Sequence, residues 1–474
     1  MTDVQPAPDI PAATEAVPIG KVRIRDLRKM TAHVPRFLTG LREEYGPIMR
    51  VPFGNQYAFI VSDPDVVQDV IIASSRKFDK DAQKVGPGPD DWGSTLERVL
   101  GKGLVTSAGD YHRKQRRLIQ PVFHRQRISG YGESFAKIAS EASDKFSDGK
   151  QLDFQEAMYE LALGMVTRTL FDVSLDSDVA STIRTAFPRK GGPLRWEMSP
   201  IWKFLLYLPL PANRQFKRGL RNVDAILYKM IEERRRGSGD GEDLLSVLLT
   251  VQDGDTGEKL DDKELRDEAM TLLMAGHETS SGALTWAYYL LGTNPEARER
   301  LHAELDEVLG DRLPEVSDLP RLKWTDAVFT EALRLYPPAW ILVRRAVTEF
   351  TALGYHIPKN SVIMVSPYIV HRDPQWWPEA ERFAPQRWVD SDDGDPLSGH
   401  ATAPGRPKMS YLPYGAGPRQ CIGNSFAQME GVMALATLSR KWEFEPVGPP
   451  PARVTSDITL QPRGGLQMIP RRRR

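Results

Sequence analysis

The sequence predicts a mainly helical protein with a small β-rich part, and two patterns carry that prediction. Apolar residues recur at helical spacing almost without interruption from residue 262 to residue 291. A helix of that length rises by about 1.5 Å per residue and would cross most of a domain. Alternation of apolar and polar residues, which is typical of half-buried strands, is found mainly in residues 48–62. We therefore expect a strand-rich corner beside a helical body.

The composition describes a globular protein with a balanced charge. The chain has 474 residues, of which 63 are basic and 63 acidic, and 41% are hydrophobic. A balanced charge does not favour a polyanionic partner, so we expect no binding to nucleic acid. The apolar stretch at 201–211 is shorter than the roughly 20 residues of a membrane span, and it contains Lys203 and Pro209. We expect a cytoplasmic protein without a membrane span.

No repeat or linker divides the chain, so we expect a single domain over residues 21–470. Residues 1–20 are rich in Ala, Pro and acidic residues and lack the basic and apolar regions of a signal peptide. They predict a flexible N-terminal lead-in. The four arginines at 471–474 predict a solvated basic tail.

The N-terminal part contains the strand-rich corner. A helix is expected over residues 29–44, followed by a hairpin of strands 48–53 and 57–62 around a Gly-Asn turn. An Asp-Pro pair then starts a short helix over 63–70. Residues 84–103 contain five glycines and two prolines, which predicts a long irregular loop.

A basic helix is expected next, where residues 112–117 read HRKQRR. His112 and Arg116 are separated by four positions and share one helix face, so they could hold one anion together. Taken alone, the charge run is more typical of a solvated face.

The long helix of residues 262–291 contains the polar sequence AGHETS at 275–280. Gly276 inside a helix costs about 1 kcal/mol relative to Ala, so it needs a structural reason. Glu278 and Thr279 follow it, and by themselves they are compatible with a polar patch at a helix kink. We assign His277 to packing or a surface contact.

Two further helices are expected, one from Asn294 and one over residues 322–335, which Pro337 and Pro338 end. The second contains Glu331 and Arg334 at positions i and i+3. That spacing alone is common in exposed ion pairs.

Cys421 is the only cysteine of the chain, which excludes an internal disulfide and a multi-cysteine metal site. It lies in a loop with several glycines and prolines, where backbone N–H groups can approach a sulfur. Apolar residues at helical spacing follow from residue 424, and the donors at that helix start are expected to favour a thiolate. For a lone cysteine, an ordinary buried thiol is the usual alternative.

The residues around Cys421 resemble the haem-binding loop of the cytochromes P-450, F-x-x-G-x-x-x-C-x-G. Gly417, Cys421 and Gly423 are in register, and Tyr414 stands where the family usually has Phe. Further matches occur in the family's order along the chain: the basic helix at 112–116, AGHETS at 275–280, E-x-x-R at 331–334 and FAPQRW at 383–388. The resemblance covers about residues 30–470 and implies the cytochrome P-450 fold, which is mainly α with a small β-rich part.

The resemblance also implies a set of functional residues. Cys421 is expected to be the axial thiolate ligand of haem b, within a loop shaped by Tyr414, Gly417 and Gly423. The candidates for contact with the haem propionates are His112, Arg116, Arg344 and Arg419, since an Arg fork suits a carboxylate.

Glu278 and Thr279 are expected to be the catalytic acid–alcohol pair that delivers protons during oxygen activation. Gly276 would let a flat cofactor or oxygen approach the helix. Arg387 would complete a buried structural network with Glu331 and Arg334, with Gln386 and Trp388 outside its charged core.

The implied function is a haem-thiolate monooxygenase that inserts one oxygen atom from O2 into a small apolar substrate. A ferredoxin or flavodoxin with its NAD(P)H reductase is the expected electron donor, because no such module is fused to the chain. Residues 208–216, 338–347 and 365–374 resemble bacterial sesquiterpene oxygenases of the pentalenene type, which favours a terpene. An apolar pocket and lid are expected from Trp196, Trp202, Phe204, Leu206 and residues 340–343, although an aromatic stretch is more often simply part of the core. A fatty-acid hydroxylase and a non-enzymatic haem-thiolate sensor are the alternatives, and the Glu278–Thr279 pair argues against a peroxygenase.

Overall fold

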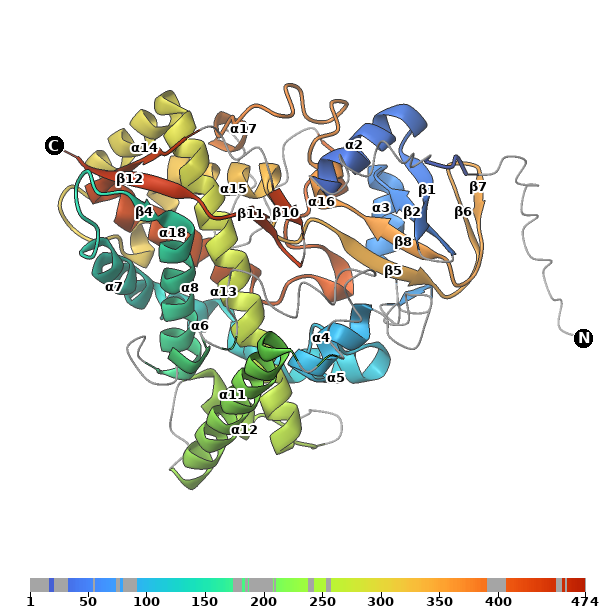
Figure 1. Cartoon of the computed structure of the whole chain (residues 1–474), viewed down its shortest axis with the longest axis horizontal. Coiled ribbons are helices and arrows are strands. Elements are labelled where there is room, and N and C mark those ends of the chain that lie inside the picture. The colour runs from blue at the N-terminus through green and yellow to red at the C-terminus, as the bar shows by residue number, and fades with distance from the viewer. Residues whose placement is uncertain are drawn as a thin grey trace, which may run out of the picture.

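The computed structural model describes residues 17–473, except for 21–32, 54–55, 74–76, 80–91, 174–180, 184–185, 187–207, 209, 238–242, 253–256, 390–405, 449–453 and 457. Most of the predicted lead-in, the predicted Gly-Asn turn and the four predicted lid residues from Trp196 to Leu206 lie outside the described residues. In the described part, helices form the body and the largest sheet lies at one end, near the N-terminus (Figure 1). The prediction of a mainly helical protein with a small β-rich part is confirmed.

The helices and strands have the following bounds. The α-helices are α2 (Val34–Tyr45), α3 (Pro64–Ile72), α4 (Trp92–Leu100), α5 (Gly109–Ile119), α6 (Arg125–Ser129), α7 (Gly132–Ser143), α8 (Phe154–Phe171), α11 (Pro211–Arg236), α12 (Leu244–Thr250), α13 (Asp262–Thr293), α14 (Pro295–Val308), α15 (Lys323–Leu335), α16 (Pro367–Val370), α17 (Gln386–Val389) and α18 (Asn424–Lys441). The strands are β1 (Ile48–Phe53), β2 (Gln56–Val61), β3 (Phe78–Asp79), β4 (Leu152–Asp153), β5 (Leu342–Ala346), β6 (Phe350–Ala352), β7 (Tyr355–Ile357), β8 (Val362–Val365), β9 (Trp442–Pro446), β10 (Val454–Ser456), β11 (Leu460–Pro462) and β12 (Gln467–Arg472).

The predicted hairpin of β1 and β2 forms one side of a five-stranded sheet with the order β1-β2-β8-β5-β3. β8 pairs parallel to β2 and antiparallel to β5, and every residue of its sequence VIMV is buried. A central strand covered on both faces needs such a continuous apolar run. Asp63 caps α3 by accepting hydrogen bonds from the N–H groups of the next turn, as the Asp-Pro pair predicts.

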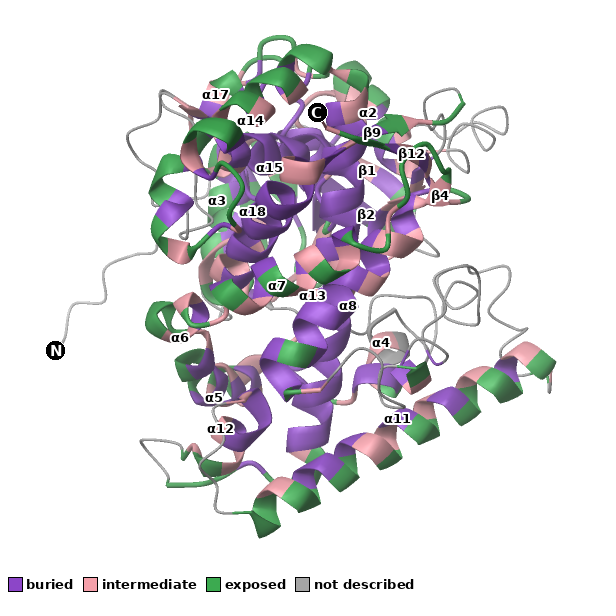
Figure 2. Cartoon of the chain, turned by 90° about the vertical axis from the view of Figure 1, so that its left-hand side faces the viewer, coloured by how far each residue is buried: buried purple, intermediate pink, exposed green. Residues whose placement is uncertain are grey.

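Helix α13 is the central element of the body, as its periodicity predicts. It starts with a capping box in which Asp261 and Glu264 satisfy each other's backbone N–H groups. α8 packs along it, and both helices are buried over most of their length (Figure 2). Helices that are buried on nearly all sides belong in the core of a large domain.

Two predictions about the remaining chain need correction. Residues 84–103 are not one irregular loop, because α4 occupies Trp92–Leu100, where Leu96, Val99 and Leu100 have helical spacing and the last two are buried. Residues 471–473 do not form a separate tail, although Arg471 and Arg472 are exposed. Arg471 and Arg472 pair with β9 as the end of β12, and Arg473 forms an ion pair with Asp306 of α14.

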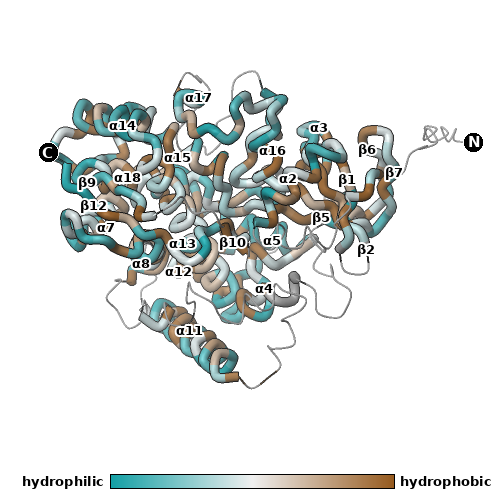
Figure 3. Tube along the Cα trace, turned by 45° about the horizontal axis from the view of Figure 1, so that its top comes forward, coloured by the Kyte–Doolittle hydropathy of each residue, from teal (hydrophilic) through white to brown (hydrophobic). Residues whose placement is uncertain are grey.

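Helix α11 borders the body on one side and is amphipathic. Its buried side carries Val223, Leu227, Met230 and Ile231, and Figure 3 shows apolar and polar residues alternating along it. Of the helices that the structure describes, none is both long and apolar enough to cross a membrane.

Candidate active site

The cysteine loop is held against the β-rich end of the molecule by a glycine with a positive φ. Gly417 has φ +65°, and a Cβ atom there would lie 2.7 Å from the carbonyl oxygen of Ile71 at the end of α3. Only glycine fits such a position without strain or collision. The N–H of Cys421 donates to the carbonyl of Tyr414 (2.9 Å), which closes the loop before α18 begins.

The thiol of Cys421 is accessible, although protein atoms surround it. Its side chain is solvent-accessible, yet burial among protein atoms raises its pKa. These two observations agree if the sulfur lines an enclosed space. A hydrogen bond with the Gly423 backbone and the charge of Arg116 lower the pKa, but burial outweighs them. The expected donors are present and act in the predicted direction, because they favour the thiolate; burial opposes them, and a bound metal cation would favour the thiolate further.

Tyr414 is more than an aromatic neighbour of the sulfur. Its hydroxyl donates to Oε1 of Gln428 on α18 (2.9 Å), and Nε2 of Gln428 donates to Asp326 (2.7 Å) and Thr330 (3.1 Å) of α15. Burial and the nearby Cys421 raise the pKa of Tyr414 well above its usual range, so the phenol stays protonated. The substitution of Tyr for the family's Phe therefore links the loop to two helices.

Two arginines tie the cysteine loop to the region of α5. Nη1 of Arg116 donates to the carbonyl of Gln420 (2.7 Å), and Nη1 of Arg419 donates to the carbonyl of Ser107 (2.7 Å). His112 lies one turn before Arg116 and is buried. The structure thus brings three of the four predicted anion-binding residues to the loop.

Arg344 reaches the site by a different route. It lies on β5, is 7% exposed and donates to the carbonyl of Val343 (2.9 Å). The start of β5 approaches the cysteine loop, because a Cβ atom at Gly415 would lie 3.9 Å from Leu342. Ile341, Leu342 and Val343 are each partly accessible, which places apolar surface beside the loop.

Helix α13 has one accessible patch in its buried central part. Leu265–Met274 and Ser280–Leu291 are buried, whereas Ala275 is exposed and Gly276, Glu278 and Thr279 are partly accessible. The hydroxyl of Thr279 donates to the carbonyl of Ala275 (2.7 Å). The patch coincides with the predicted acid–alcohol pair.

Gly276 has a packing reason that the sequence did not indicate. A Cβ atom there would lie 2.8 Å from Cγ2 of Val166, so the glycine permits close packing of α8 against α13. His277 packs, as predicted: its ring is buried, with Nδ1 2.6 Å from the carbonyl of Leu273 and Nε2 3.0 Å from the hydroxyl of Tyr159. Burial lowers the pKa of His277 to about 4, so the ring is neutral.

The two halves of the site are joined by a buried polar contact. The hydroxyl of Ser280, next to Thr279, donates to Oε2 of Glu430 on α18 (2.5 Å). α18 starts directly after the cysteine loop and contacts α13. The thiol therefore lies just before a helix that neighbours the accessible patch of α13. Neither residue was singled out from the sequence, where no local pattern marks this contact.

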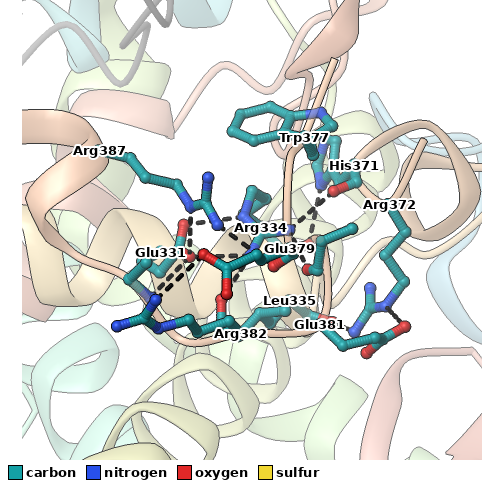
Figure 4. A network of polar contacts seen from close by, with 12 residues as sticks. Glu331, Arg334, Leu335, His371, Arg372, Trp377, Glu379, Glu381, Arg382 and Arg387 are labelled. Carbon is teal, nitrogen blue, oxygen red and sulfur yellow. Dashed lines mark hydrogen bonds and ion pairs between the residues drawn. The ribbon is translucent and has the colours of Figure 1, made fainter. Parts of the chain in front are cut away.

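Behind the loop, Glu331 and Arg334 form a fully paired buried network (Figure 4). All five N–H donors of Arg334 are used, two by Glu331 and three by the backbone carbonyls of residues 371, 380 and 382. Nε of Arg387 lies 3.5 Å from Oε1 of Glu331, so Arg387 joins the network as predicted. Trp388, expected outside the charged core, donates its indole N–H to Glu331 (2.8 Å).

His371 connects this network to the loop. Its Nδ1 lies 3.2 Å from the carbonyl of Arg334, and its Nε2 accepts from the N–H of Leu412 (2.9 Å). Burial lowers its pKa well below the usual range, which keeps the ring neutral and able to accept.

The residues present fit a haem group. They provide one accessible thiol that needs a cation to ionise, an N–H donor directed at its sulfur, and guanidinium groups at the edge that suit carboxylates. Helix α13, which contacts α18, adds an accessible patch at Ala275, Glu278 and Thr279.

Comparison with known proteins agrees with this geometry. Cyclooctat-9-en-7-ol 5-monooxygenase of Streptomyces melanosporofaciens is 35% identical over 413 residues, which are 87% of this chain and 85% of that protein. Pentalenene oxygenase of Streptomyces avermitilis is 34% identical over 399 residues, 84% of each chain. The crystal structure of the cytochrome P450DA heme domain matches the fold with a TM-score of 0.81 at 24% identity, covering 97% of this chain and 98% of that one. The sequence model of the family Cytochrome P450 matches residues 23–468, and this chain accordingly belongs to the cytochrome P450 family and is a haem-dependent monooxygenase.

Proposed function

We propose that this monooxygenase hydroxylates a terpene, with Cys421 as the thiolate ligand of haem b. The observation that carries the substrate class is the similarity to two bacterial enzymes whose names specify pentalenene and cyclooctat-9-en-7-ol, both terpenes. The partly accessible apolar residues Ile341, Leu342 and Val343 beside the cysteine loop support an apolar substrate.

The haem, when bound, supplies the oxygen-activating iron, and the thiolate favours cleavage of the O–O bond. Tyr414, Gly417 and Gly423 shape the loop that presents the Cys421 sulfur, and the Gly423 backbone hydrogen-bonds to it. His112, Arg116, Arg344 and Arg419 would hold the two propionates at the edge of the site. The positive charge of the three guanidinium groups would offset the carboxylates.

Glu278 and Thr279 would deliver protons. Thr279 Oγ1 donates to the carbonyl of Ala275 (2.7 Å), and its two lone pairs can accept hydrogen bonds. A hydroxyl of this kind passes protons without becoming charged, provided that a carboxyl group nearby replaces them. The location of both residues in the accessible patch of α13 supports this assignment.

The electrons would come from a ferredoxin or flavodoxin with its NAD(P)H reductase. α5 exposes Arg113 and Arg117 on the side opposite the buried His112. An acidic electron carrier would be attracted to such a face.

The test begins with the carbon monoxide difference spectrum of the reduced protein and continues with a titration of the ferric protein by terpenes and fatty acids. We expect the Soret band of a thiolate-ligated haem, loss of that band in Cys421→Ser, and a spin-state change only with terpenes. Hydroxylated product should then form from a terpene that binds. A response to fatty acids alone would contradict the terpene assignment, and a thiolate band in Cys421→Ser would contradict the ligand assignment.

A further inference from the structure

The hairpin of β10 and β11 is anchored to α13 beside the accessible patch. The two strands are antiparallel, with Thr455 opposite Gln461. The carbonyl of Leu460 accepts a hydrogen bond from Nε1 of Trp286 on α13 (3.0 Å), and its N–H donates to the carbonyl of Pro338 (3.1 Å). The backbone of the hairpin is therefore fixed relative to the central helix.

Two side chains of this hairpin contact Glu278. Oγ1 of Thr459, which is 6% exposed, donates to Oε1 of Glu278 (2.7 Å). Nε2 of Gln461 donates to the backbone carbonyl of Glu278 (3.1 Å). One contact fixes the carboxylate and the other fixes the backbone from which it extends.

The direction of each hydrogen bond follows from the partners. A backbone carbonyl can only accept, so the Gln461 group that faces it must be the amide nitrogen. The same nitrogen lies 3.3 Å from Oγ1 of Thr459, which must accept from it and is left with its own hydrogen for Glu278. Gln155 of α8 donates to the other end of the Gln461 amide (3.0 Å) and holds its orientation.

The surface of α13 is shaped to receive this amide. A Cβ atom at Gly282 would lie 2.6 Å from Nε2 of Gln461. The glycine leaves room for the Gln461 side chain on α13, one turn after Glu278. The contact thus depends on residues from α8, α13 and the β10–β11 hairpin.

We propose that Thr459 and Gln461 are positioning residues that hold the carboxylate of Glu278 in place for proton delivery. This inference rests on the proposed role of Glu278 as the acid of the relay. A glutamate side chain has three rotatable bonds, and a proton donor must lie within hydrogen-bond reach of its acceptor. Fixing one carboxylate oxygen removes most of that freedom, so the carboxyl group returns to the same position in each catalytic cycle.

The decisive variant is Thr459→Val, which keeps the shape of the side chain and removes the hydroxyl. We expect the fraction of reducing equivalents recovered in product to fall by about threefold to tenfold, part of the full effect of a general acid. The dissociation constant for substrate, from the ferric spin-state titration, should stay within about twofold because catalysis is affected and binding is not. Thr459→Ser retains the hydroxyl and should restore the coupling, that is, the fraction of reducing equivalents recovered in product.

Thr285→Val is the matched control. Thr285 is a fully buried threonine of α13 whose hydroxyl donates to the carbonyl of Ser281 (2.6 Å), away from Glu278. It should lose stability comparably while coupling remains unchanged. Loss of coupling in this variant as well would show that removing any buried hydroxyl from α13 suffices, and would overturn the proposal.

A double-mutant cycle with Glu278→Gln distinguishes the inference from the proposed function. Thr459→Val should add no further uncoupling to Glu278→Gln, and the melting temperatures of the haem-free proteins should be non-additive as well, which needs no turnover. Normal coupling in Thr459→Val, with Glu278→Gln uncoupled, would refute the inference and leave the relay intact. Normal coupling in Glu278→Gln would refute the proposed relay itself, and the inference with it.

Discussion

Replacing Glu430 by glutamine is expected to stabilise the protein at alkaline pH and not at acidic pH. Glu430 lies on α18, is fully buried and accepts the hydroxyl of Ser280 at Oε2, while its Oε1 has no hydrogen-bond partner among the described residues. Burial raises the pKa of Glu430 from 4.5 to about 8, against the opposing effect of Ser280. At neutral pH the carboxyl group is therefore protonated in the folded protein and ionised in the unfolded one.

The sign and size of the effect follow from proton linkage. Between pH 4.5 and about 8 the folded state binds one more proton at this site than the unfolded state, so the free energy of unfolding falls as the pH rises. At about 1.36 kcal/mol per unit, the 2.5 units from pH 5.5 to 8 correspond to about 3.4 kcal/mol. Above pH 8 the loss levels off, because Glu430 ionises in both states.

Glutamine removes this dependence at a constant cost. The glutamine amide would place its N–H groups where Oε1 of Glu430 now has no hydrogen-bond partner among the described residues. Such unsatisfied buried donors lower the free energy of unfolding by about 1–3 kcal/mol at every pH. The variant should therefore be similar to the wild type or less stable at pH 5.5, and more stable by about 2–4 kcal/mol at pH 8. With an unfolding entropy of about 2.1 cal/mol/K per residue over this chain length, 1 kcal/mol corresponds to about 1 °C in melting temperature.

The assay is a series of melting temperatures between pH 5.5 and 8.5 for the wild type, Glu430→Gln and the control Glu299→Gln. Glu299 is an exposed glutamate of α14, so its variant should follow the wild-type curve. The difference between Glu430→Gln and the wild type should increase by about 3 °C from pH 5.5 to 8. A difference that stays constant with pH would refute the claim that Glu430 is protonated in the folded protein.

Three further substitutions test the packing around the site. Gly276→Ala should lower the melting temperature, because its Cβ atom would lie 2.8 Å from Val166. The control Gly40→Ala lies on α2 with open space around it and should raise the melting temperature slightly. Equal effects of the two substitutions would contradict the packing role of Gly276. Tyr414→Phe restores the residue usual in the family but leaves the buried amide oxygen of Gln428 without its donor. Chemical denaturation should therefore show that the free energy of unfolding falls by about 1–3 kcal/mol. A rise in this free energy would count against the contact. Glu331→Gln should lower the free energy of unfolding by about 3–5 kcal/mol and reduce the yield of folded holoprotein, because the buried guanidinium of Arg334 loses its counter-charge. A normal yield with normal haem content would contradict this role of Glu331.

The sequence predicted the elements whose information is local. α5, α13, α15 and α18 each carry apolar residues at helical spacing and a start or stop signal, and these are the helices that bear the family's motifs. The cysteine loop could be predicted because its residues lie within a short stretch, where backbone geometry requires Gly417. α4 was missed because its segment contains glycines and prolines that outweighed three well-spaced apolar residues, and α7, α8, α11 and α12 were not predicted either.

The contacts that position the site could not be predicted in the same way. Thr459 and Glu278 are separated by 181 residues, and Trp388 is 57 residues from Glu331. No spacing rule relates residues so far apart, because the chain between them must first fold. Gly276 shows the same limit: its position in the motif suggested the approach of a cofactor, and nothing local indicated that its Cβ position would collide with a valine of α8.

Two buried glutamates around the cysteine loop are stabilised in opposite ways. Glu331 forms an ion pair with Arg334 and accepts further hydrogen bonds from Trp388 and the backbone, so its charge is compensated. Glu430 has one hydroxyl donor, from Ser280, and remains neutral because burial is not compensated. If it ionised, it would need further donors, which only water or a displacement of α13 from α18 could provide. Ser280 directly follows Thr279, so the protonation of Glu430 connects the stability of the helix contact to the geometry of the proposed proton relay.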